Sequence, residues 1–376
     1  MIYLGPIIVH CAQDHPPRSE LYLAAHNLVI KAGPGAFDSI RRHGFAPEQI
    51  GTIAGASGGA KWLVLSQLDR FILENIVPKL DGPVHLLGSS IGAWRFACYA
   101  QNDPVAAIDR FEQAYIGQSY SESPDIHEIT KMSREIVKIV LAGNAVDQIL
   151  SHPVFRTHIM TVKGRHIAAS ENHIVLALAL VAAASMNALH RNLLGLFFKR
   201  ALFFDARDLP PCFDVTGFPL QKIRIRGGNI EDAIVATGSI PLVLSGVKDI
   251  EGADPGMYRD GGVIDYHLDL PQSTTDRLTL FPHFSDRVIP GWFDKKLFWR
   301  GPDPVNFDKT ILVHPSAEFV ARLPAGKIPD RTDFGNYAPL DRIRIWQDVV
   351  AECSALADEF NDVLETDQLA ARLQPL

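Results

Sequence analysis

Two serines in this sequence stand in glycine-rich turns of the kind that expose a nucleophile. Ser57 lies in Gly-Ala-Ser-Gly-Gly at 55–59, and Ser90 lies in Gly-Ser-Ser-Ile-Gly at 88–92. Both match Gly-x-Ser-x-Gly, and both follow a short apolar run and precede a helix-like pattern. Such a turn lifts the hydroxyl clear of a sheet and points the positive end of the helix at it. Spacing alone does not choose between them, and we take Ser57 as the first candidate nucleophile.

A nucleophilic serine needs a nearby base, and Asp260 is the first candidate for it. Asp260 stands in Arg-Asp-Gly-Gly between apolar residues, where a surface ion pair is poorly placed. The structural alternative is a turn aspartate that bonds its own backbone. A second hypothesis makes Ser90 the nucleophile of a triad with Asp260 and a histidine, because three histidines follow Asp260 in the Ser, Asp, His order of an α/β-hydrolase. The three are His267, His283 and His314.

The reaction also needs hydrogen-bond donors for the oxyanion that forms when the serine attacks a carbonyl. Ala-Gly-Pro-Gly-Ala-Phe at 32–37 is a candidate donor loop, with the backbone amides of Gly33, Gly35 and Ala36 open to close approach. A tight structural turn is the alternative interpretation. Gly58 and Ser90 are predicted to line the same crevice and to contact substrate.

Three successive strand–turn–helix units place these turns. One strand is expected at 28–31, a second ends at Ala54 and a third begins at Val84, each followed by a glycine-rich turn. Repeated units of this kind predict a parallel sheet flanked by helices. Ligand sites in such sheets lie beyond the carboxyl ends of the strands, so all three turns are expected to face one crevice.

The remaining chain supplies further elements and no internal repeat or linker. Helical spacing is found in 104–150, in a short segment at 230–237 and in a last helix at 341–364. Further strands are expected near 158–163, 202–206, 222–226, 278–281 and 310–313. We therefore expect one domain, made of an N-terminal extension (1–27), a catalytic core (28–268) and a C-terminal part of the same domain (269–376).

An apolar insertion near 165–200 interrupts this core. Residues 174–184 are eleven apolar residues in a row, and 193–198 form a second apolar cluster before Lys199 and Arg200. A membrane-spanning helix needs about 20 predominantly apolar residues, and polar residues at 187–192 interrupt this segment. A buried helical hairpin is one interpretation. An apolar lid or flap that contacts a membrane through 174–198 is the other.

Composition excludes several classes of function. The net charge of −7 argues against nucleic acid as the main partner. The four cysteines (Cys11, Cys98, Cys212 and Cys353) lie far apart, which predicts buried reduced thiols rather than disulfides or a zinc site. No spacing of metal ligands is found, so no metal or other cofactor is predicted. The first residues show no basic region before an apolar run, which predicts a cytoplasmic protein.

Taken together, the motifs resemble the patatin-like phospholipase family. That family has a glycine-rich oxyanion loop, a Gly-x-Ser-x-Gly turn and a later Asp-Gly-Gly or Asp-Gly-Ala turn, to which 32–37, 54–60 and 259–265 are similar. Ala-Thr-Gly-Ser-Ile-Pro at 236–241 is similar to a further stretch of the family. In the loop at 32–37, Pro34 interrupts the glycine run, and Phe37 and Asp38 stand where the family has a basic residue.

The resemblance implies a fold and an activity. The implied fold is α/β, in three α/β/α layers around a mostly parallel central sheet. The implied site is a Ser57–Asp260 dyad, with the amides of Gly33, Gly35 and Ala36 as the oxyanion hole. The implied reaction is hydrolysis of a phospholipid or lysophospholipid ester through an acyl-serine. The first residues and the 174–198 segment separately predict a cytoplasmic protein that can lie peripheral to a membrane. A lipid-binding protein without turnover is the hypothesis from another class.

Overall fold

The computed structural model describes residues 26–273 and 276–376. Nearly all of the predicted extension 1–27, and Cys11 with it, lies outside the described residues. The strands are β1 (Leu28–Ala32), β2 (Ile50–Gly55), β3 (Val84–Ser89), β4 (Phe155–Gly164), β5 (Phe198–Phe204), β6 (Leu220–Arg224), β7 (Val247–Lys248), β8 (Met257–Asp260), β9 (Leu278–Pro282), β10 (Thr310–Pro315) and β11 (Leu373–Pro375). The helices are α1 (Pro34–His43), α2 (Ser66–Phe71), α3 (Ile91–Tyr99), α4 (Pro104–Ile116), α5 (Ile126–Val140), α6 (Ala145–Ser151), α7 (His173–Leu189), α8 (Ile230–Thr237), α9 (Ala317–Arg322), α10 (Asp333–Asn336), α11 (Pro339–Glu352), α12 (Ser354–Glu365) and α13 (Leu369–Arg372).

One central sheet organises the molecule. Its strand order is β11-β1-β10-β9-β2-β3-β4-β5-β6, with β8 paired to β4 and β7 to β8. The five strands β10, β9, β2, β3 and β4 run parallel to one another. β1 and β5 run antiparallel to their neighbours β10 and β4. The predicted α/β fold with a mostly parallel central sheet is therefore confirmed.

The direction of β1 corrects one expectation. Ala32, at the end of β1, pairs with Ile311, near the beginning of β10. Because β10 is parallel to β2 and β3, the carboxyl end of β1 lies at the edge of the sheet opposite to theirs. The loop at 33–36 consequently does not face the crevice reached by the turns after β2 and β3. The successive strand–turn–helix units predicted that β1 and β2 point the same way. In the sheet, however, β9 and β10 lie between β1 and β2.

Helix α3 packs closely on the centre of the sheet. A Cβ atom on Gly92 would overlap the carbonyl oxygen of Gly55, so glycine at this position lets α3 approach β2. The guanidinium of Arg95 forms a buried ion pair with Asp69 of α2, its Nε donating at 2.8 Å. Trp94 Nε1 donates to the carbonyl oxygen of Ile234 in α8 at 2.7 Å. These contacts fix α3, whose first turn follows Ser90.

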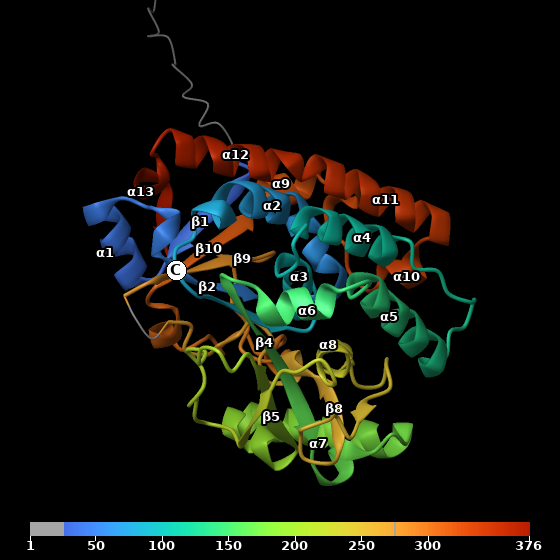
Figure 1. The fold of residues 1–376 in the computed structure, drawn as a ribbon. Helices are drawn as coiled ribbons and strands as arrows, with labels where there is room; N and C mark the ends of the chain where they lie inside the picture. Colours follow the sequence, from blue (N-terminus) through green and yellow to red (C-terminus); the bar gives the residue numbers. More distant parts are fainter. Residues whose placement is uncertain (1–25, 274–275) are drawn as a thin grey trace, which may run out of the picture.

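Other predicted elements differ in detail from those observed. The helix expected after Ser57 consists of the 3₁₀ helix η2 (Gly59–Leu65), α2 and the π-helical turn η3 (Ile72–Ile76). The expected last helix is two helices, α11 and α12, which pack over α2 and α4 as an outer layer (Figure 1). Cys98, Cys212 and Cys353 are buried and free, as predicted.

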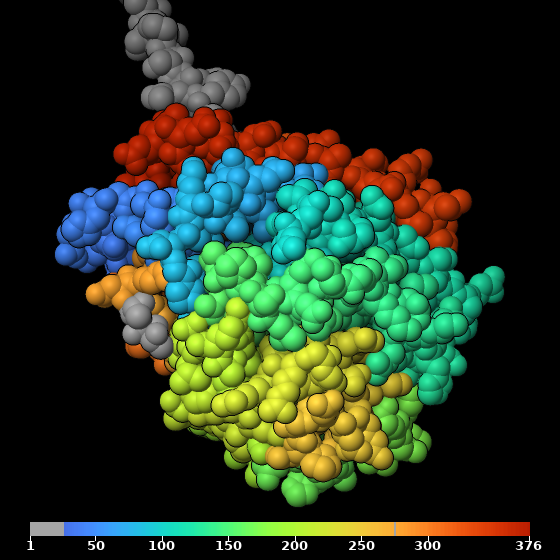
Figure 2. All heavy atoms as spheres, viewed as in Figure 1, coloured from blue at the N-terminus to red at the C-terminus, as the bar shows by residue number. Residues whose placement is uncertain are grey.

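The apolar insertion contains one long helix, α7, followed by the 3₁₀ helix η6 (Arg191–Leu196). The inner face of α7 packs on Val162 of β4 and Phe198 of β5 through Leu176 and Leu180. Its outer face is exposed. Figures 1 and 2 show α7 at the end of the molecule opposite α11 and α12. Within 26–273 and 276–376, no helix has both the length and the apolar character needed to cross a bilayer.

Candidate active site

Ser90 occupies a sharp turn between β3 and α3. Its backbone has φ 53° and ψ −128°, a conformation that costs a non-glycine residue energy and recurs at active sites. Gly88 and Gly92 flank the turn because a Cβ at either position would overlap neighbouring backbone, of Ala93 or of Gly55. The Gly-x-Ser-x-Gly spacing at 88–92 is therefore what this crossing of strand and helix requires.

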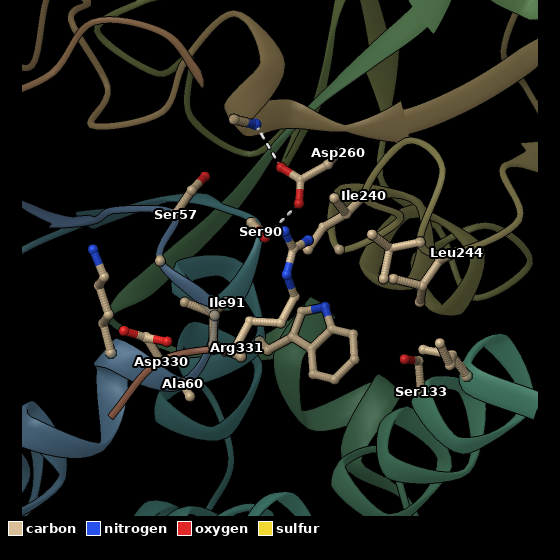
Figure 3. A pocket seen from close by; sticks show the side chains of 18 of the residues that line it. Ser57, Ala60, Ser90, Ile91, Ser133, Ile240, Leu244, Asp260, Asp330 and Arg331 are labelled. Carbon is tan, nitrogen blue, oxygen red and sulfur yellow. Dashed lines mark hydrogen bonds between the residues drawn. The ribbon is translucent and has the colours of Figure 1, made fainter. Parts of the chain in front are cut away.

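Asp260 accepts a hydrogen bond from Ser90. The Ser90 hydroxyl lies 2.7 Å from Asp260 Oδ2, and the amide of Gly262 donates to Oδ1 at 2.7 Å (Figure 3). Burial raises the pKa of Asp260 to about 6, although the hydrogen bonds from Ser90 and Gly262 act in the opposite direction. A carboxylate with a pKa near neutrality can accept a proton from an attacking hydroxyl and return it.

The end of α8 and the loop that follows it hold both members of this pair. The backbone amide of Ser90 donates to Thr237 Oγ1 at 2.8 Å, and the amide of Asp260 donates to the carbonyl oxygen of Ser239 at 3.0 Å. The Thr237 hydroxyl in turn donates to the carbonyl oxygen of Met160 in β4. The serine and the carboxylate are thus positioned from one short segment.

Ser57 lies in the same site but makes different contacts. Its buried hydroxyl lies 3.0 Å from Ser89 Oγ, and its amide donates to the carbonyl oxygen of Tyr266 at 2.8 Å. The hydrogen bonds of Asp260 go to Ser90 and Gly262 rather than to Ser57. The structure brings Ser57 next to the pair without joining it. The assignment of Ser57 as nucleophile stays a prediction, and the geometry favours the Ser90 alternative.

The amides of the predicted donor loop are occupied within the fold. Gly33 donates to the carbonyl oxygen of Thr310, Gly35 to Asp308 Oδ1 and Ala36 to the carbonyl oxygen of Asp308, at 2.8–2.9 Å. Because β1 runs antiparallel, these amides also lie at the far edge of the sheet. The structure thus contradicts their assignment as an oxyanion hole.

Open amides are found instead beside Ser57. In the described part of the chain, the amides of Gly58, Gly59 and Ala60 have no hydrogen-bond partner, since η2 begins there and its first N–H groups point away from the helix. All three residues line the cavity that contains Ser90 and Asp260. This segment can supply the donors that an oxyanion requires. Gly58, predicted to contact substrate, is part of it.

The cavity has a volume of about 470 Å³, within the range of small-molecule sites. One side is apolar, and in Figure 3 Ile240 and Leu244 lie on that side of Ser90 and Asp260. Part of the apolar lining comes from α3, α5 and the loop after α8: Ile91, Trp94, Ile129, Ile136, Ile240, Val243 and Leu244. A flexible hydrocarbon chain fits this chemistry.

No histidine of the described residues lines this cavity. His267 and His283 are buried against each other, with ring centroids 4.3 Å apart, and His314 lies beside its own neighbour Pro315. Burial lowers the pKa of His283 to about 3, and that of His267 falls well below its usual range. Because Asp260 bonds Ser90 directly, no imidazole stands between them.

Three cations that line the cavity, Lys61, Lys295 and Arg331, were not predicted from the sequence. Lys61 follows Gly58-Gly59-Ala60, a local signal that was present. Lys295 and Arg331 come from the C-terminal part of the chain, where no motif marks them. Within 26–273 and 276–376, no group of three or more histidine, cysteine or acidic side chains is placed to hold a metal ion.

No protein-family model matches the chain, and no curated protein sequence matches it. Two solved structures are similar in fold. The first is the crystal structure of VipD from Legionella pneumophila, with 12% identity and a TM-score of 0.31, covering 70% of this chain and 54% of that one. The second is human GIVD cytosolic phospholipase A2, with 9% identity and a TM-score of 0.33, covering 89% of this chain and 63% of that one. The chain therefore spans less than two thirds of the length of either protein.

Proposed function

We propose that this protein is a serine acyl hydrolase that cleaves a lipid acyl ester through a Ser90–Asp260 dyad. The observation that carries the proposal is the 2.7 Å hydrogen bond between a serine on a strained turn and a buried carboxylate of raised pKa. The open amides at 58–60 and the apolar side of the cavity support it. A binding protein without turnover would not need this serine and carboxylate to be paired.

The geometry suggests the order of steps. Ser90 Oγ attacks the ester carbon while its proton passes to Asp260, and the resulting oxyanion accepts hydrogen bonds from the amides of Gly58 and Gly59. The alcohol leaves with the proton from Asp260, and an acyl-serine remains. Water then attacks the acyl group and gives its proton to Asp260. That proton returns to Ser90 as the carboxylic acid leaves.

The first experiment identifies the serine. A fluorophosphonate reacts covalently with an activated serine, and mass spectrometry of the digested protein locates the adduct. We expect the adduct on Ser90 and much slower labelling in Asp260→Asn, because the hydroxyl then lacks its base. An adduct on Ser57 would identify Ser57 as the nucleophile instead, and no adduct on either serine would contradict the proposed enzyme class.

Contact with a membrane through α7 is a further part of the proposal. On its outer face Leu178 is 64% exposed and Leu189 is 77% exposed, and Ile174 and Val181 are exposed beside them. Exposed apolar patches of this kind mark contact surfaces. Helix α7 adjoins the cavity through the 3₁₀ helix η8 (Trp292–Asp294). Asn187 of α7 donates to Asp294 of η8 at 2.7 Å, and Trp292 of η8 lines the cavity. A lipid surface that binds this face would place its acyl chains near Ser90.

Vesicle co-sedimentation tests this contact. The double variant Leu178→Ser with Leu189→Ser is expected to bind phospholipid vesicles about tenfold more weakly or worse, because burying each leucine in the bilayer contributes about 1.5–3 kcal/mol. Leu340→Ser is the matched control, since Leu340 is 81% exposed at the start of α11, far from α7. Unchanged binding of the double variant, or an equal loss in the control, would count against the contact.

A further inference from the structure

Three cations surround the candidate dyad. Lys61 of η2, Lys295 after η8 and Arg331 before α10 all line the cavity that contains Ser90 and Asp260. In Figure 3 the side chain of Arg331 extends toward Ser90 and Asp260. These cations come from segments far apart in the sequence, so their meeting at one cavity is a property of the fold.

None of the three forms an ion pair with any residue of the described chain. The ammonium group of Lys61 lies 5.1 Å from the centre of the Phe284 ring, and that of Lys295 lies 4.0 Å from the centre of the Tyr266 ring. These ring contacts attract a cation but leave its hydrogen-bond donors unused. The donors are therefore available to a ligand.

The acidic residues of the lining offset these cations only in part, through Asp330 near Lys61 and Asp260 near Lys295. Apart from Asp260, the acidic residue of the lining is Asp330, whose carboxylate pairs with Lys327 at 3.0 Å and accepts the amide of Thr332 at 2.7 Å. The lining consequently has more cationic side chains than acidic ones, with Lys61, Lys295 and Arg331 against Asp260 and Asp330. Burial and repulsion from Lys61 lower the pKa of Lys295 to about 8, so it is still mostly charged at pH 7.

This arrangement selects for a net negative ligand. Like charges gathered in a partly desolvated site repel one another, and an anion that binds between them removes that cost. A zwitterionic head group carries a cation as well as an anion. Asp330, the lining carboxylate besides Asp260, is already paired with Lys327 and so does not attract that cation. A neutral head group would leave the donors unused. The apolar side of the same cavity accommodates the acyl chain.

We propose that the substrate is a lipid acyl ester whose head group is net anionic, of the phosphate type, and that Arg331 and Lys295, with Lys61, bind this head group. The inference rests on the proposed function. It adds that Arg331 is a specificity-determining residue, which distinguishes anionic from zwitterionic and neutral head groups on the same acyl chain.

Binding of ether lipids tests the inference apart from catalysis. Three single-chain lipids with the same alkyl ether chain carry a phosphate, a phosphocholine or a glycerol head group, and none can be hydrolysed. Titration calorimetry below their micelle concentrations is expected to give at least tenfold tighter binding of the phosphate lipid, equivalent to about 1.4 kcal/mol. Arg331→Gln should reduce the ratio of phosphate to phosphocholine affinity at least fivefold. Arg344→Gln, on an exposed side chain of α11, should keep the wild-type ratio.

A soluble phosphate compound separates a lipid head group from a free anion. Glycerol 3-phosphate is expected to bind at least tenfold more weakly than the phosphate lipid, because it does not use the apolar side. Equal affinity of the two would overturn the lipid assignment. Equal affinities for the three ether lipids, or an equal loss for all three in Arg331→Gln, would overturn the head-group selection. Selective binding of the phosphate lipid without any ester hydrolysis would support this inference and contradict the proposed function.

Discussion

Replacing Ser90 by alanine is expected to lower ester hydrolysis by at least about a thousandfold, because the reaction loses its nucleophile. Ser57→Ala is expected to lower it by less than about tenfold, since the Ser57 hydroxyl bonds Ser89 rather than the base. Both variants should fold, because each change removes only one small polar group from a buried site. Initial rates on a soluble p-nitrophenyl ester, with a thermal melt of each variant, measure the two effects.

The comparison between the two serines is decisive because they share one cavity and one short motif. A loss of similar size in both variants would indicate that the site as a whole is damaged. Full activity in Ser90→Ala, with loss in Ser57→Ala, would contradict the proposed dyad.

Replacing Asp260 by asparagine is expected to lower ester hydrolysis and, at pH 7, to raise the stability of the fold. The asparagine can still accept from Gly262 and donate to Ser90, but it cannot take up the proton, so hydrolysis should fall about a thousandfold. The folded protein should become more stable at pH 7. Asp260 has a pKa of about 6 in the folded state against about 3.9 in an unfolded chain, so keeping it ionised and buried costs about 3 kcal/mol.

The sign of this effect gives a pH test. A carboxyl whose folded-state pKa is raised holds its proton more tightly when folded, so the wild-type protein loses stability as pH rises from about 4 to about 6. The advantage of Asp260→Asn should therefore be absent at pH 4 and full at pH 7, where it corresponds to about 4 °C in melting temperature. In the wild-type protein kcat/KM should rise with pH up to about 6 and then level off, because the base must be ionised.

Asp254 is a suitable control because its pKa is shifted in the direction opposite to that of Asp260. Its pKa is lowered by the hydrogen bond from Lys199, so Asp254→Asn should not stabilise the protein at pH 7. A gain in both aspartate variants would point to a general effect of removing negative charge. Identical melting curves for the wild type and Asp260→Asn between pH 4 and pH 7 would contradict the raised pKa.

Much of the fold is determined by local patterns that can be read directly. The strand–turn–helix units around β2 and β3 and the bounds of α8 were predicted because apolar spacing and glycine turns are local signals. The direction of β1 was not, because it depends on pairing with β10, nearly three hundred residues later in the sequence. The misplacement of Gly33, Gly35 and Ala36 follows from that one strand.

The choice between Ser57 and Ser90 also depended on distant contacts. Gly92 is required because α3 approaches Gly55 of another strand, and no five-residue pattern reports that approach. A local signal was nevertheless present in the residues after Ser57. Three small residues, Gly58, Gly59 and Ala60, stand between Ser57 and Lys61 and let a ligand approach the backbone closely. Arg331 carried no signal, since only the folded chain brings it to the cavity.

The insertion of β9 and β10 between β1 and β2 affects how the protein can be made on a ribosome. Among the described strands, β1 pairs with β10 and β11, so it lacks these partners until β10 has been synthesised, and β2 has one open edge until β9 emerges. Unpaired strand edges attract other chains, and contacts between distant residues form slowly. The central part of the sheet therefore cannot be completed in the nascent chain until β9 and β10 have both emerged. The chain's dependence on chaperones should be greatest during that interval.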